Sequence, residues 1–362
     1  MGAHGRQVRQ RRVKILVRAA NWLGDAVMSL PALRALRARF PDAHITVLAK
    51  PWVASLYEAE RSLDRIIPLE GASGPRDWGR KWHLGTTLRR ERFDLAILLP
   101  NSFESAAIVW LSRTRRRIGY ARDGRSSLLT DAVPVPRLGE IPRHERNYYP
   151  ELLRRAGLID ALPRIDEILF DGLAESRARG AALFSARGIA LPVIGVSPGA
   201  AYGGAKRWLP ENFAAAAREL SARRKASVVV FGSAAEEDLC SQVAAASGGI
   251  SLAGSTTLRE FMDMTAACGL CLTNDSGAMH IAAASGVPCV TVFGPTDETA
   301  TGPTGASARL VREPVDCAPC LRRECPIDHR CMTRVSVDRV LAAALEATPG
   351  GSPAGRSPSP DS

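Results

Sequence analysis

Short apolar runs alternate along this chain with longer segments whose apolar residues recur at helical spacing. In the first half, the short runs predict strands at residues 13–19, 45–49 and 94–100. A helix is predicted between the first two strands, because an apolar face repeats there at Leu30, Leu33, Leu36 and Phe40. We expect Pro31 in the first turn of this helix, where its missing N–H leaves no helical hydrogen bond unmade.

The alternation is more regular in the second half. Apolar runs predict strands at 193–198, 226–232, 269–274 and 288–294. Helical patterns lie near 211–224, 234–247 and 258–267, and another begins at 277. Alternating strands and helices are typical of parallel sheets with helices on both faces. We therefore predict an α/β fold in which two Rossmann-like, doubly wound domains face a central cleft.

The length of 362 residues fits two domains of ordinary size. We place the N-terminal domain at 13–175 and the C-terminal domain at 176–347. Residues 1–12 form a basic segment expected to be a flexible arm, and residues 348–362 are rich in Pro, Gly and Ser and expected to be a disordered tail.

The composition narrows the choice of partner. A formal net charge of +11 favours an anionic partner such as a phosphorylated substrate, an acidic membrane surface or nucleic acid. Aromatic residues are only 6% of the chain, which argues against the stacking platforms of single-strand binders, and we expect no nucleic-acid partner. No apolar run approaches the length of a membrane span. We expect a cytoplasmic protein with reduced cysteines.

Three polar motifs follow predicted strands, at the sheet edge where ligands bind in such folds. In the first, Gly24 permits a tight turn and Asp25 follows at a helix start. Asp25 could be a general base for a hydroxyl nucleophile, or it could cap the helix. A helix N-terminus stabilises the ionised carboxylate, which would weaken the base.

The second motif, residues 197–213, places Ser197 and Gly199 after a strand and Lys206 just before a helix. Lys206 could neutralise a phosphate, or this could be a solvated basic loop. The third motif puts Asp275, Ser276 and Gly277 between a strand and a helix of small residues. Free N–H groups at such a helix start suit a diphosphate, although Asp275 or Ser276 could simply cap the helix.

Taken together, these motifs closely resemble the ADP-heptose:lipopolysaccharide heptosyltransferases of glycosyltransferase family 9. Four stretches carry the resemblance further, namely GRKWHLGTTLR (79–89), LPNSF (99–103), YGGAKRW (202–208) and GPTDETATGP (294–303). The first three most resemble the members that add the second inner-core heptose, and the fourth also fits the family. One departure is Gly204, where the family usually has proline, and we expect this change to loosen the loop.

The resemblance implies a GT-B fold and inverting transfer without a catalytic metal or other required cofactor. The donor would be ADP-L-glycero-β-D-manno-heptose, and the acceptor the anionic core glycolipid heptosyl-Kdo2-lipid A, at the inner face of the inner membrane. By position, Asp25 matches the proposed base and Lys206 the lysine on the donor diphosphate. The resemblance assigns the remaining donor-side positions to Gly24, Ser197, Gly199, Asp275, Ser276, Gly277 and His280. Glu236 or Glu237 could reach the ribose or adenine, or both could be first-turn helix acids.

On the acceptor side, phosphates and acidic sugars require cations. Arginines are dense between residues 113 and 125, and Arg143 follows. Each could equally belong to a solvated basic face. Our acceptor-binding candidates are Asn101, Ser102, Arg122, Arg125 and Arg143.

Four cysteines lie close together in the spacing C-x2-C-x4-C-x5-C, at Cys317, Cys320, Cys325 and Cys331. Four thiolates at this spacing could hold a structural zinc ion. The other cysteines, Cys240, Cys268, Cys271 and Cys289, lie in apolar runs and are predicted to be buried packing residues.

Two other functions are compatible with these residues. The same fold could use another nucleotide sugar or another acceptor. The chain could also be a non-catalytic protein that binds a nucleotide or a nucleic acid. A comparison of ADP, GDP and UDP binding distinguishes the donors, and an Asp25→Asn variant distinguishes catalysis from binding.

Overall fold

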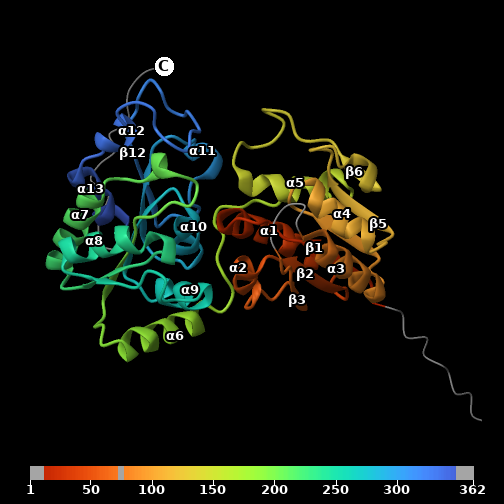
Figure 1. The fold of residues 1–362 in the computed structure, drawn as a ribbon, viewed down its shortest axis with the longest axis horizontal. Coiled ribbons are helices and arrows are strands. Elements are labelled where there is room, and N and C mark those ends of the chain that lie inside the picture. The colour runs from red at the N-terminus through yellow and green to blue at the C-terminus, as the bar shows by residue number, and fades with distance from the viewer. Residues whose placement is uncertain (1–11, 72–76, 348–362) are drawn as a thin grey trace, which may run out of the picture. The chain divides into compact units, whose positions relative to one another are not determined.

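A computed structural model describes residues 12–71 and 77–347 (Figure 1). The predicted arm and tail lie outside these residues, except for Arg12. The chain divides into two compact units. Among the described residues, the first unit contains those up to Asn21, together with Ser29–Ile141 and Asn147–Pro163. The second contains Trp22–Met28, Pro142–Arg146 and the residues from Arg164 onward.

The first sheet has parallel strands in the order β3-β2-β1-β4-β5-β6. Its strands are β1 (Lys14–Arg18), β2 (His44–Ala49), β3 (Arg65–Pro68), β4 (Leu95–Leu98), β5 (Arg116–Tyr120) and β6 (Asp131–Val133). The helices of this half of the chain are α1 (Leu23–Arg39), α2 (Pro51–Ala54), α3 (Trp78–Glu91), α4 (Phe103–Leu111) and α5 (Tyr148–Arg155).

The second sheet is also parallel, in the order β12-β11-β10-β7-β8-β9. Its strands are β7 (Val193–Ser197), β8 (Ser227–Val230), β9 (Ile250–Ser251), β10 (Leu270–Asn274), β11 (Cys289–Phe293) and β12 (Ala308–Arg312). The helices are α6 (Leu173–Ala186), α7 (Pro210–Arg224), α8 (Glu237–Ser247), α9 (Leu258–Ala266), α10 (Gly277–Ala284), α11 (Glu298–Thr301), α12 (Arg330–Thr333) and α13 (Val337–Ala347).

Alternate residues along the second sheet's strands pack into two separate cores, as expected for a sheet buried on both faces. Ile194 and Val196 join the core that includes α7, α8 and α13. Val193 joins the core that includes α6, α9 and α10. Both sheets show the doubly wound strand order, which confirms the predicted α/β fold with two Rossmann-like halves.

The predicted helix start near Pro31 is wrong. Helix α1 begins at Leu23, directly after β1, so Pro31 lies inside the helix. The first turn contains Gly24 and Asp25, which confirms the helix start predicted from the first motif although the apolar spacing did not indicate it. Burial of Leu30 and the leucines that follow it outweighs the hydrogen bond that Pro31 removes.

The arginine-rich segment 113–125 is also more ordered than its composition suggests. Arg116 and Arg117 begin β5, and the strand continues into buried Ile118, Gly119 and Tyr120. The predicted packing of the cysteines outside the C-terminal cluster is confirmed, because Cys240, Cys268, Cys271 and Cys289 are all buried. No helix among the described residues is both long and apolar enough to cross a membrane.

Candidate active site

In each sheet, the chain leaves the two central strands in opposite directions, and this switch point is where doubly wound folds bind ligands. In the first sheet the switch lies between β1 and β4, and in the second between β7 and β10. Asp25 lies in the first turn of α1, after β1, and Asn101 follows β4. Ser197 ends β7, and Asp275 follows β10. The candidate residues therefore lie at the carboxyl ends of central strands.

Lys206 and Asp275 form a buried ion pair at the start of α10. Lys206 Nζ lies 2.6 Å from Asp275 Oδ2, and the two side chains are 13% and 5% exposed. The same oxygen accepts a hydrogen bond from Thr296 Oγ1 at 2.5 Å. Lys206 Nζ also lies 4.9 Å from the centre of the Tyr202 ring. These contacts fix the ammonium group beside the helix start.

Neither of the predicted cap residues uses its side chain to cap α10. Ser276 is the N-cap residue, but its side chain makes no cap hydrogen bond. The Oδ2 atom of Asp275 instead accepts from Lys206 and Thr296. Capping therefore does not account for these two residues, and the positive end of the helix dipole lies beside the Lys206–Asp275 pair.

The start of α1 packs directly against α10 through two glycines. A Cβ atom at Gly24 would lie 2.7 Å from Cδ2 of His280, and one at Gly277 would lie 2.8 Å from Leu23 Cβ. Larger residues would force these helix starts apart. Both glycines thus allow Asp25 to approach the Lys206–Asp275 pair, and Lys206 is near enough to act on the Asp25 pKa.

The pKa of Asp25 is raised to about 6. Burial is the main cause, and the positive charge of Lys206 opposes it. The expected weakening of this base by the helix N-terminus is therefore outweighed by desolvation. His280 is buried nearby, and burial lowers its pKa to about 4 despite the attraction of Asp275. At neutral pH, Asp25 is thus a carboxylate with increased proton affinity beside a neutral imidazole.

Asn274 is a residue of this site that sequence reasoning missed. It is fully buried at the end of β10. Its Oδ1 accepts from the Trp208 backbone N–H at 2.9 Å, and its Nδ2 donates to the Pro198 carbonyl at 2.7 Å. This amide ties the loop after β7 and the end of the Lys206 loop to one strand. The sequence could have indicated this residue, because Asn274 is a side-chain amide at the end of an otherwise apolar strand.

The cysteine-rich segment holds the loop that carries Lys206. Four hydrogen bonds join them, from Tyr202 OH to Leu321 O (2.7 Å), Gly204 N to Glu324 Oε1 (3.0 Å), Ala205 N to Arg323 O (2.9 Å), and between His329 Nε2 and Ala205 O (2.8 Å). A Cβ atom at Gly203 would lie only 2.3 Å from Arg323 O, so this approach requires glycine. Gly204 was expected to loosen the loop, but its N–H makes a hydrogen bond that proline could not.

The other residues predicted for the donor side lie around the ends of β7 and β8. Glu236 accepts hydrogen bonds from Ser233 N and Oγ, at 2.9 and 2.8 Å, in a capping box. Its carboxylate also lies against Gly199, where a Cβ atom would be 2.0 Å from Oε1. Glu237 is exposed in the first turn of α8. Of the two glutamates, Glu236 is therefore the one placed beside the loop after β7.

On the acceptor side, Asn101 is fixed by two neighbours. Its Nδ2 donates to Tyr148 OH at 3.0 Å, and its Oδ1 accepts from Arg125 Nη2 at 3.2 Å. Ser102 caps α4, because its Oγ accepts from Ser105 N at 3.3 Å. Ser102 remains exposed.

The three candidate arginines do not form one cluster. Arg125 is completely buried, and its guanidinium donates to Pro100 O, Tyr120 O and Ser105 Oγ. Burial lowers its pKa to about 10. Contrary to our expectation of an acceptor contact, Arg125 braces the end of β4. Arg122 is exposed beside Asp123, and Arg143 pairs with Asp297 in the second unit.

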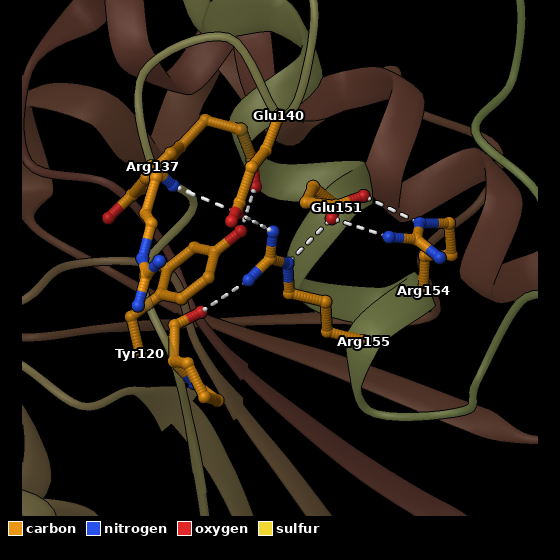
Figure 2. Close-up of polar contacts among 8 residues, drawn as sticks. Tyr120, Arg137, Glu140, Glu151, Arg154 and Arg155 are labelled. Atoms are coloured by element: carbon orange, nitrogen blue, oxygen red, sulfur yellow. Dashed lines mark hydrogen bonds and ion pairs between the residues drawn. The ribbon is translucent and has the colours of Figure 1, made fainter.

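Tyr148, whose hydroxyl accepts a hydrogen bond from Asn101, is the first residue of α5. Charged residues of the same helix form a network. Figure 2 shows Glu151 of α5 accepting hydrogen bonds from Arg154 and Arg155, at 2.7 and 2.6 Å respectively. These bonds hold the pKa of the buried Glu151 carboxyl below its usual value. Tyr120 OH donates to the Tyr148 carbonyl at 2.8 Å, and their ring centres are 4.5 Å apart. The start of α5 is thus joined to β5 through Tyr120 and to Asn101, which follows β4.

Comparison with known proteins identifies the family. The model of glycosyltransferase family 9 (heptosyltransferase) matches residues 81–330. The lipopolysaccharide heptosyltransferase 2 of Salmonella typhimurium is 34% identical over 309 residues, covering 83% of this chain and 88% of the relative. The chain belongs to glycosyltransferase family 9. It is therefore a glycosyltransferase enzyme.

Other relatives of this glycosyltransferase agree. The lipopolysaccharide heptosyltransferase 2 of Escherichia coli is 33% identical over 313 residues, covering 83% of this chain and 88% of the relative. A solved structure of E. coli ADP-heptose lps heptosyltransferase II matches with a TM-score of 0.78 and 29% identity, covering 92% of this chain and 98% of that one. The predicted GT-B type of fold is confirmed by this match.

The four clustered cysteines of this glycosyltransferase line a single pocket of about 310 Å³, together with His329. Burial is the main cause that raises the pKa of the Cys331 thiol to about 11, and the other three cysteines add to it. Among residues 12–71 and 77–347, no group of three or more potential ligands is arranged to hold a metal ion. The structural zinc stays a prediction.

Proposed function

We propose that this glycosyltransferase transfers heptose from ADP-L-glycero-β-D-manno-heptose to the first heptose of the lipopolysaccharide inner core. The relatives named lipopolysaccharide heptosyltransferase 2 support this acceptor class, and the solved relative named for ADP-heptose supports the donor. The observation that supports the chemistry is the raised pKa of Asp25, which is about 6 although Lys206 of the Lys206–Asp275 pair acts on it. Because such an acceptor is lipid-anchored, we place the enzyme at the cytoplasmic face of the inner membrane.

The donor diphosphate binds at the start of α10 in this proposal. Lys206 and the backbone N–H groups of Ser276 and Gly277 supply the positive field. Asp275, which also accepts a hydrogen bond from Thr296, holds Lys206 before the donor arrives, so little reorganisation is needed when the diphosphate binds. Ser197, Gly199 and Glu236 line the remainder of the donor site.

Transfer then occurs in one displacement. Asp25 accepts the proton of the acceptor hydroxyl, and the hydroxyl oxygen bonds to the anomeric carbon as the bond to the diphosphate breaks. ADP departs with the electron pair of that bond, and attack from the opposite side inverts the anomeric centre. Lys206 and the α10 start stabilise the negative charge that grows on ADP. No catalytic metal is part of this proposal.

The test is a transfer assay with purified enzyme, ADP-heptose and two core-truncated glycolipids, one ending in heptose and one ending in Kdo. We expect transfer to the heptose-terminated glycolipid and little to the other. Replacing ADP-heptose with a UDP or GDP sugar is expected to abolish transfer. Efficient use of a UDP sugar, or transfer only to the Kdo-terminated glycolipid, would contradict the proposal.

A further inference from the structure

A group of exposed arginines and tryptophans on α3, on α4 and on the segment between α4 and β5 takes no part in the proposed reaction. We call it the Arg–Trp face, and it consists of Trp82, Arg89, Arg90, Trp110, Arg113 and Arg115. A hollow of about 350 Å³ is lined by both tryptophans and by Arg89, Arg113 and Arg115. A larger adjoining hollow of about 940 Å³ shares these three arginines and adds Arg90. One continuous surface therefore joins the six side chains.

Close packing of α3 on α4 brings this surface together. A Cβ atom at Gly85 would lie 2.5 Å from Leu111 Cβ and 3.3 Å from the Ile108 carbonyl, so the helices approach through glycine. Trp82 and Trp110 are 60% and 48% exposed, on adjacent helices. Their rings are thus left at the protein surface although the helices beneath them are tightly packed.

The positive charge of the Arg–Trp face is not neutralised by neighbouring acids. Arg89, Arg90, Arg113 and Arg115 are exposed, and their guanidinium groups have no hydrogen-bond or ion-pair partner among the described residues. Asp94, which lines the larger hollow, accepts a hydrogen bond from the Lys14 backbone N–H at 2.9 Å. Two further carboxylates of this half of the chain form ion pairs with other residues. Glu91 pairs with Lys14 and Arg65, and Glu104 pairs with Lys81 at 3.2 Å, as the structure records them.

The Arg–Trp face is separate from the acceptor site. Arg115 directly precedes β5, and Asp94, which lines the larger hollow, directly precedes β4. Asn101 follows the same β4 at its other end. At about 3.3 Å per residue, Asp94 and Asn101 are roughly 20 Å apart along the strand direction. The Arg–Trp face therefore lies toward the opposite end of β4 from Asn101, away from a sugar bound there.

We propose that the Arg–Trp face docks this enzyme onto an anionic phospholipid bilayer. This proposal rests on the proposed function, because an enzyme whose acceptor is lipid-anchored must work at a membrane surface. Indole rings favour the headgroup region of a bilayer, where an apolar ring and a polar N–H are both accommodated. Unpaired arginines are attracted to anionic headgroups. The combination of both residue types, with no free acid among them, fits a bilayer better than it fits an RNA backbone.

The experiment measures flotation of the full-length protein with vesicles. One vesicle type is phosphatidylcholine alone, and the other contains one part phosphatidylglycerol to three parts phosphatidylcholine. We expect binding to the anionic vesicles only. Each arginine near an anionic surface contributes about fivefold to partitioning, so Arg89→Ala/Arg113→Ala/Arg115→Ala should weaken binding about a hundredfold. Trp82→Ala/Trp110→Ala should weaken it as well.

A matched control removes the same charge from the second unit, as Arg218→Ala/Arg223→Ala/Arg334→Ala, and is expected to bind almost as wild type does. Heptosyl transfer to a detergent-dispersed acceptor should be unchanged in the Arg89 triple variant, which separates docking from catalysis. Because flotation needs no donor, failure of the proposed reaction leaves this test intact. Equal loss in the control, normal flotation of the Arg89 triple variant, or preference for RNA over vesicles would overturn the proposal.

Discussion

Replacement of Asp25 by Asn should stabilise the protein while it removes most of the activity. Burial raises the pKa of Asp25 from 3.8 to about 6, so the folded state favours the protonated carboxyl more than the unfolded chain does. Well below pH 3.8 both states are protonated, and the carboxyl costs nothing. Between pH 3.8 and about 6 the unfolded chain ionises while the folded state keeps its proton, so stability falls by about 3 kcal/mol, and this cost persists at higher pH.

Asn carries no charge at any pH, so Asp25→Asn should be about 3 kcal/mol more stable than wild type at pH 8 and equally stable at about pH 3, where both states of Asp25 are protonated. Thermal unfolding at the two pH values measures this difference. The matched control is Asp160→Asn, the same change at an exposed position, which should be neutral at both. Transfer by Asp25→Asn should fall by about 10² to 10⁴. A variant that is destabilised at pH 8, or that transfers heptose within tenfold of wild type, would refute this reasoning.

Three further predictions concern the parts that surround Asp25 and Lys206. Asn274→Ala should lose about 3 kcal/mol of unfolding free energy, because two buried backbone groups lose their partner, as denaturant unfolding would measure. Gly203→Ala should displace the Lys206 loop and weaken ADP binding in calorimetry, since the new Cβ would lie 2.3 Å from Arg323 O; unchanged affinity would contradict this. If segment 317–331 holds zinc, the purified protein should contain about one zinc per chain and lose thermal stability with a chelator. Zinc-free protein of unaltered stability would reject that prediction.

Much of the fold was predictable because buried parallel strands read as apolar runs. The strands expected at 193–198 and 269–274 correspond to β7 and β10. The candidate site residues were also predictable from their positions after strands, since the residues that follow central strands meet at one edge of the sheet. By contrast, β5 was not predicted. It begins with Arg116 and Arg117, which are partly exposed, so this segment was interpreted as a basic cluster.

The contacts that position the site residues were harder to predict from the sequence, because they join residues that are far apart along the chain. The hydrogen bond from Gly204 to Glu324 spans 120 positions, and no local pattern indicates it. Burial reversed two other expectations. It made Arg125 an internal brace, and it raised the pKa of Asp25 where the helix start alone predicted a weaker base. Desolvation depends on what packs around a group, which spacing along the chain does not reveal.

The pH dependence of kcat/KM for heptosyl transfer tests most directly whether Asp25 removes the acceptor proton. Our account predicts that kcat/KM rises with pH through an ionisation near 6, and that the residual rate of Asp25→Asn shows no such ionisation. A profile in which the ionisation lies near 4, or in which it persists unchanged in Asp25→Asn, would contradict the account.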